Sequence, residues 1–190
     1  MVNSHGFLPK ADRGQLDERL GHRLEKWLTN AYEDDNLFLT LARRPGLLDV
    51  VWQWIRFTYG GESTVDARLF EIVRQRLAFS NKCVHCSSVQ VSQAAAEQLE
   101  EREEILRKLF DYEEADFPDH VKAALRFADR LSGDSPEGFT EGEFEDLRRY
   151  FTEDQILDLG MQCAFFIGWQ RFNAAMGILP DAGVDGSTLP

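Results

Sequence analysis

The chain has 190 residues, which suffices for one domain with a substantial core. An apolar fraction of 43%, with 14 Phe and 4 Trp residues, argues against a disordered chain. The net charge of −12 disfavours nucleic acid as a partner, because phosphate binding requires clustered Lys and Arg. No apolar run approaches the roughly 20 residues of a membrane-spanning helix.

The cysteine content and the N-terminus bear on the cellular compartment. Residues 1–10 lack the apolar core of a secretory signal. Three cysteines, an odd number, do not make the disulfide framework of a secreted protein. We therefore expect a cytoplasmic protein with neither a membrane nor a nucleic-acid partner.

The N-terminal part of the chain has the spacing of amphipathic helices. One apolar stripe extends from Leu16 to Ala31, and the run Asp34–Asn36 is expected to cap the next helix. Pro45 ends that helix and fits the first turn of another, which Gly60 and Gly61 interrupt.

Helix caps are also expected on both sides of the next segment. Ser63 or Thr64 is expected to cap a helix that continues to about Phe79. The pair Ser80–Asn81 is expected to cap a new helix that begins near Cys83.

Helical signals continue to the end of the chain. Thr140–Glu143 and Thr152–Gln155 both fit the capping box, in which two side chains satisfy free backbone N–H groups. The last helix carries apolar residues between Ile156 and Phe172. Because no strand alternation appears, the sequence predicts a single-domain, all-α helical bundle.

The chemistry of the chain is concentrated in Cys83-Val84-His85-Cys86. At the start of a helix, this spacing puts both sulfurs on one face, where a disulfide forms with little movement. Free N–H groups and the helix dipole there stabilise a thiolate, which favours Cys83 as the reactive thiol. His85 is suited to exchange protons near neutral pH. A structural zinc site and a pair of inert, buried cysteines are the alternatives, although zinc usually needs four ligands.

Glu71 lies on the preceding helix. If the two helices form a hairpin, its carboxylate returns to the cysteines and relays protons through His85 or water. We therefore take Cys83, Cys86, His85 and Glu71 as the candidate catalytic residues, with no metal and no cofactor.

The joint spacing of Glu71, Cys83, His85 and Cys86 resembles the signature of the carboxymuconolactone decarboxylase-like superfamily, in its alkyl hydroperoxidase D (AhpD-type) branch. The resemblance extends from about Leu37 to Leu179 and includes the closing stretch from Phe166 to Asn173. It implies an AhpD-like helical domain over 37–179. The apolar stripe before this domain predicts an N-terminal helical extension over residues 1–36, and the Gly-rich, polar end of the chain predicts a flexible tail over 180–190. The resemblance also implies a homo-oligomer.

The resemblance implies peroxide reduction through the cysteine pair. Cys86 would attack the peroxide and become a sulfenic acid, and Cys83 would then close the disulfide and meet a dithiol reductant. This order conflicts with the helix-dipole argument for Cys83, and we prefer the family's order. The family's usual second relay His is replaced by Gln90, which cannot exchange protons at neutral pH. Weaker peroxidase activity, slower thiol-disulfide exchange or a different substrate is therefore expected.

Two alternative functions stay open. One is a cofactor-free decarboxylase, as in the other branch of the superfamily, although such chemistry has no use for a dithiol. The other is a non-enzymatic redox sensor whose disulfide alters a partner surface. Among the remaining residues, we expect Cys163 in the core, His120 in a surface or capping role, and Trp52, Trp54 and Trp169 in the core or at oligomer contacts.

Overall fold

The protein is built from helices alone in the part of the chain that can be described. The computed structural model describes residues 6–30, 34–88, 99–133 and 138–180, and this part contains no strand. None of its helices has the length and apolarity to cross a membrane. In chain order the helices are η1 (Arg13–Gln15), α1 (Glu18–Asn30), α2 (Asn36–Ala42), α3 (Pro45–Tyr59), α4 (Ala67–Ser80), α5 (Val84–Ser88), α6 (Leu99–Lys108), η3 (Leu109–Asp111), α7 (Asp119–Ser132), α8 (Glu141–Arg148) and α9 (Glu153–Ala175).

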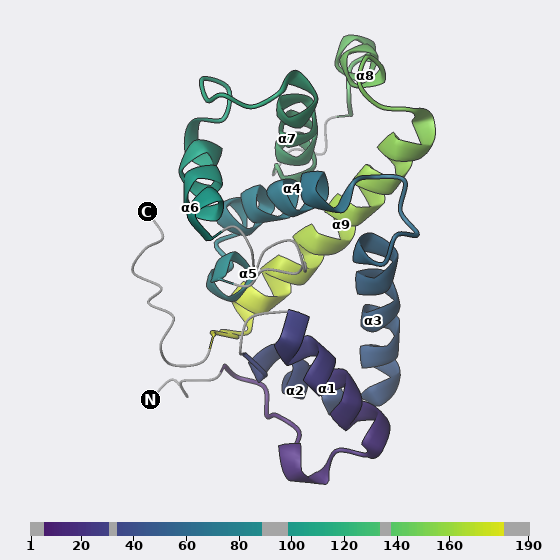
Figure 1. Cartoon of the computed structure of the whole chain (residues 1–190), viewed down its shortest axis with the longest axis vertical. Helices are drawn as coiled ribbons and strands as arrows, with labels where there is room; N and C mark the ends of the chain where they lie inside the picture. Colours follow the sequence, from purple (N-terminus) through teal and green to yellow (C-terminus); the bar gives the residue numbers. More distant parts are fainter. Residues whose placement is uncertain (1–5, 31–33, 89–98, 134–137, 181–190) are drawn as a thin grey trace.

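Helix α9 is the axis around which the other helices are arranged. It packs against α4, α5 and α7, and Figure 1 shows it running diagonally through the molecule. Its start is the predicted capping box, in which Thr152 accepts the N–H of Gln155 and the Gln155 side chain accepts the N–H of Thr152. The box predicted at Thr140 likewise begins α8. Such caps stabilise a helix by about 1 kcal/mol.

Two apolar cores lie on either side of α9. One joins α4, α7, α8 and α9, and has Phe70, Leu77 and Leu159 at its centre. The other joins α1, α2 and α3, and contains the predicted stripe of α1 through Leu24 and Trp27. Phe165 and Trp169 of α9 pack against both cores, so this part of α9 connects the two groups of helices.

The start of α4 differs from the sequence prediction. Asp66, rather than Ser63 or Thr64, is its N-cap, and its carboxylate accepts the N–H groups of Arg68 and Leu69. Thr64 instead donates through its N–H and its hydroxyl to Asp158 of α9. The side chain of Thr64 thus forms a tertiary hydrogen bond instead of the helix cap that the sequence predicted.

Candidate functional site

The two cysteines of the CxxC sequence are joined by a disulfide, with Cys83 directly before α5 and Cys86 within it. Their Cα atoms are 5.2 Å apart. Both residues are buried, with Cys83 1% and Cys86 4% exposed, and they pack with Ala78 and Trp169. The spacing in the sequence therefore predicted the pairing correctly.

The turn before the disulfide was predicted wrongly. Asn81 does not cap α5: it ends α4, and its side chain donates to Leu77 O and Gln170 Oε1. Lys82 follows with φ +53°, a left-handed conformation that costs a non-Gly residue about 1 kcal/mol. Cys83 then precedes α5, and its own sulfur accepts the N–H of Cys86 at 3.2 Å. In this tight turn the side chain of Asn81 therefore binds α4 and α9 and does not cap α5.

Glu71 belongs to a buried cluster of hydrogen bonds and charges. Its carboxylate accepts bonds from Tyr59 Oη at 2.9 Å and from Arg74 Nε and Nη2 at 2.8 and 2.6 Å, with a longer bond from Gln75. Arg74 Nη1 donates to the carbonyl oxygen of Cys86 at 2.7 Å. Arg74 therefore links Glu71 to the dithiol. Neither Tyr59 nor Arg74 was among the residues predicted from the sequence.

The ionisation of this cluster follows from its burial. Burial disfavours the charge on Arg74, but the adjacent Glu71 carboxylate outweighs it and raises the pKa of Arg74 above its usual value. Burial, together with the charge of Glu71, also raises the pKa of Tyr59 well above its usual value. Arg74 is therefore a permanent cation beside Cys86, and Tyr59 keeps the proton that it donates to Glu71.

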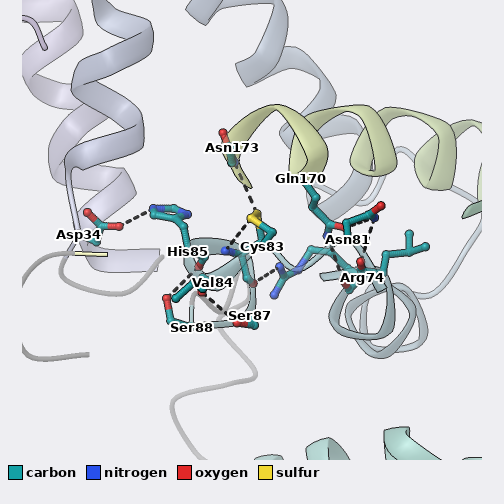
Figure 2. The surroundings of a disulfide bond; sticks show 12 residues. Asp34, Arg74, Asn81, Cys83, Val84, His85, Ser87, Ser88, Gln170 and Asn173 are labelled. Carbon is teal, nitrogen blue, oxygen red and sulfur yellow. Dashed lines mark hydrogen bonds and ion pairs between the residues drawn. A yellow bond between two sulfur atoms is a disulfide. The ribbon is translucent and has the colours of Figure 1, made fainter. Parts of the chain in front are cut away.

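His85 is directed away from this cluster. Its Nε2 is paired with Asp34 Oδ2, and both side chains are almost fully buried. Figure 2 shows the His85 ring pointing at Asp34, which lies in the connection between α1 and α2. Asp34 was predicted only as a cap, and its Oδ1 does accept the N–H of Asn36 at the start of α2.

Asn173 of α9 completes the surroundings of the disulfide. Its Nδ2 donates to Cys86 Sγ at 3.5 Å. Figure 2 shows the Asn173 side chain directed at the sulfur atoms of the disulfide. The closing stretch from Phe166 to Asn173 was noticed in the sequence, but Asn173 was given no role there. Gln170, one turn earlier, donates to the carbonyl oxygen of Arg74 and thereby fixes α9 against α4.

A small cavity of about 30 Å³ opens onto Cys86. It has room for roughly one water-sized molecule. Cys86, His85 and Arg74 are its polar lining, and Cys83 does not line it. The rest of the wall is apolar and mostly aromatic: Trp27, Leu37, Ile55, Phe165, Phe166 and Trp169.

The other residues considered from the sequence lie away from this cavity or outside the described residues. Cys163 is a fully buried core thiol, and burial raises its pKa, so it is unsuited to thiolate chemistry. His120 lies in the first turn of α7 and lines a separate groove with residues of α4 and α6. Gln90 and the tail from residue 181 onward lie outside the described residues. Within the described residues, no group of three or more His, Cys, Asp or Glu side chains is arranged to hold a metal ion.

Comparisons with known proteins identify the fold. No protein-family model matches the chain, and no curated protein matches its sequence. Among solved structures, an uncharacterized peroxidase-related protein with an AhpD core, from Ralstonia eutropha JMP134, has a TM-score of 0.75 at 24% identity, over 93% of both chains. A peroxidase-related protein from Silicibacter sp. TM1040 has a TM-score of 0.75 at 23% identity, over 92% of this chain and 90% of that chain.

A third similar structure is that of a cysteine-to-alanine variant of the debrominase Bmp8 in complex with 2,3,4-tribromopyrrole. Its TM-score is 0.70 at 20% identity, over 93% of this chain and 92% of that chain. These likenesses show that the chain has the AhpD-like helical fold, which confirms the all-α fold class predicted from the sequence.

Proposed function

We propose that this chain, whose fold is AhpD-like, is a dithiol oxidoreductase that reduces small organic hydroperoxides with Cys86 and Cys83. The observation that carries the proposal is the position of Cys86. Its sulfur is paired with that of Cys83, it accepts a hydrogen bond from Asn173, and the residue lines an apolar cavity.

The cavity also favours Cys86 as the attacking thiol. Cys86 belongs to the cavity wall, whereas Cys83 is not among the lining residues and packs with Ala78. A peroxide oxygen that enters the cavity would therefore meet Cys86 rather than Cys83. The nearby guanidinium of Arg74, together with the amide of Asn173, favours the thiolate, which is the nucleophilic form.

The proposed cycle has three balanced steps. The Cys86 thiolate attacks the terminal oxygen of the hydroperoxide, the O–O bond breaks, and the alkoxide takes up a proton, leaving an alcohol and Cys86 sulfenic acid. The Cys83 thiol then displaces water from this sulfur and forms the disulfide. An external dithiol finally reduces the disulfide by thiol–disulfide exchange and is itself oxidised to a disulfide.

In this cycle Glu71 acts through Arg74. Its carboxylate holds the guanidinium with two short bonds, and the guanidinium in turn holds the Cys86 carbonyl. The cavity has room for about one water-sized group, which suits the terminal oxygen of a hydroperoxide, and its apolar walls suit an alkyl substituent beside that oxygen.

The test is stopped-flow oxidation of the reduced protein by a small alkyl hydroperoxide. Wild type, Cys83→Ser and Cys86→Ser are compared, with Cys163→Ala as the control. We expect rapid loss of two thiols in wild type and in the control, a sulfenic acid trapped by dimedone in Cys83→Ser, and no fast phase in Cys86→Ser. Oxidation of wild type no faster than that of a free thiol would refute the proposal.

A second candidate function is reductive dehalogenation of a small haloaromatic compound. The aromatic cavity wall at Cys86 favours it, and the debrominase has a similar fold. The two thiols would supply two electrons, so that a carbon–halogen bond is replaced by carbon–hydrogen with release of halide and formation of the disulfide. Bromide release from 2,3,4-tribromopyrrole by the reduced protein, with no fast hydroperoxide reaction, would favour this function over the first.

A further inference from the structure

Asp34 lies outside the CxxC segment and outside the helix of Glu71, yet its side chain is buried against His85. We propose that Asp34 is a positioning residue of the thiol site, which orients His85 and enables it to exchange the proton required at Cys86. This inference rests on the proposed thiol chemistry and adds to it a residue from the N-terminal part of the chain.

The position of Asp34 is fixed by contacts on three sides. Its carbonyl oxygen accepts the indole N–H of Trp27 at 2.8 Å, and its Oδ1 accepts the N–H of Asn36 at 2.8 Å. Its Oδ2 is paired with His85 Nε2, and neither of these two atoms has a hydrogen-bond partner besides the other among the described residues. The side chains are 3% and 2% exposed.

Burial makes this pair chemically significant. A buried carboxylate is costly in free energy unless a partner compensates its charge, and His85 is the partner in this case. A carboxylate on one ring nitrogen fixes the orientation of the ring and its tautomer, and it stabilises the imidazolium form. With Nε2 bound to Asp34, Nδ1 is the ring atom left to exchange a proton.

The cavity connects His85 to the reacting sulfur. His85 and Cys86 line the same space of about 30 Å³, so a water-sized group within it is able to reach both side chains. The charged and titratable groups on this space or bound to its lining come from four elements: Asp34 from the α1–α2 connection, Tyr59 from α3, Glu71 and Arg74 from α4, and His85 with Cys86 from α5. Helices α1, α2, α3 and α9 contribute apolar side chains to the wall.

The expected direction of the effect follows from this geometry. Held in place by Asp34, His85 lies beside the cavity that Cys86 lines and is positioned to take up the thiol proton as the thiolate forms. Loss of the Asp34 charge should therefore move the pH profile of Cys86 reactivity to higher pH. A change of about one pH unit corresponds to a tenfold slower reaction at neutral pH.

The experiment measures alkylation of Cys86 by iodoacetamide as a function of pH. Reduced full-length proteins carry Cys83→Ser, so that Cys86 is the reactive thiol and Cys163 is protected by burial. In this background we compare Asp34→Asn, Asp34→Glu, His85→Gln and the double variant Asp34→Asn/His85→Gln. The matched control is Asp35→Asn, which removes a neighbouring charge whose partner, Arg13, lies on the surface.

We expect Asp34→Asn to react about tenfold more slowly at neutral pH, with its profile moved to higher pH, while Asp35→Asn follows the parent protein. If Asp34 acts through His85, the double variant reacts as slowly as His85→Gln alone. The inference is overturned if Asp34→Asn leaves the pH profile of Cys86 alkylation unchanged. It is also overturned if Asp34→Asn slows this alkylation equally whether His85 is present or replaced by Gln.

Folding and function are separated by two further measurements. If Asp34→Asn does not fold, the role of Asp34 is tested with Asp34→Glu and with an NMR titration of the His85 ring nitrogens in the parent protein. A His85 ring that shows no pH-dependent coupling to the carboxylate overturns the inference. Hydroperoxide reduction by wild type is measured in parallel. A shifted alkylation profile without peroxidase activity would support the role of Asp34 and refute the peroxidase proposal alone.

Discussion

Replacing Arg74 with Met tests the buried cluster that connects α4 to the dithiol. The guanidinium is 2% exposed and binds both oxygens of Glu71 as well as the Cys86 carbonyl. Met has a similar reach but no charge and no donor. The variant therefore leaves the Glu71 carboxylate, which is 15% exposed, without its cation and leaves the Cys86 carbonyl without this donor.

The expected loss of stability is large for a single substitution. Removing one partner of a buried ion pair costs about 3–5 kcal/mol, mainly because the other charge stays buried. Glu71 keeps the hydroxyl of Tyr59 and some contact with solvent, so we expect a loss of about 3 kcal/mol. For a chain of this size, that corresponds to a fall in melting temperature of about 6–12 °C.

The assay is thermal and urea unfolding of the oxidised protein, followed by circular dichroism. The double variant Arg74→Met/Glu71→Leu removes both charges and should recover most of the lost stability. The control is Arg126→Met, because Arg126 and its partners Glu113 and Asp146 are well exposed and such pairs contribute at most about 1 kcal/mol. A loss below about 1 kcal/mol in Arg74→Met, or no recovery in the double variant, would contradict this reasoning.

Four further results are expected. At mildly alkaline pH, the folded, oxidised protein should show no thiol that reacts with Ellman's reagent, and the unfolded protein should show one. The reason is that burial raises the pKa of Cys163 and keeps this thiol protonated; a reactive thiol in the folded protein would disprove the prediction. Reduction of the disulfide should lower the free energy of unfolding by only about 2 kcal/mol, because the loop that the disulfide closes is very short. Urea titrations with and without dithiothreitol measure this difference. Thr152→Ala should lose about 1 kcal/mol in the same titrations and leave the rate of Cys86 alkylation unchanged. Asn173→Leu should slow that alkylation several-fold, since the Cys86 thiolate loses a donor, whereas an unchanged rate would remove Asn173 from the site.

The sequence by itself determined the features that depend on local spacing. Two cysteines three residues apart come within disulfide distance because one helical turn brings them together, whatever surrounds them. The capping boxes at Thr140 and Thr152 formed as predicted, since their partners lie only three residues away. The ion pair of Glu71 with Arg74 has the same helical spacing and could have been found in the sequence.

Only the tertiary structure decided the partners that surround the dithiol. Asp34, read as a cap, reaches His85 because the packing of α1 and α2 brings their connection onto α5. Asn173, at the end of α9, donates to Cys86. Asn81 donates to Gln170 of the same helix instead of forming the predicted cap. Each contact joins residues far apart in the chain, and burial selects it because polar groups removed from water must find partners. No local pattern contains that information, since the partner is set by which helices pack together.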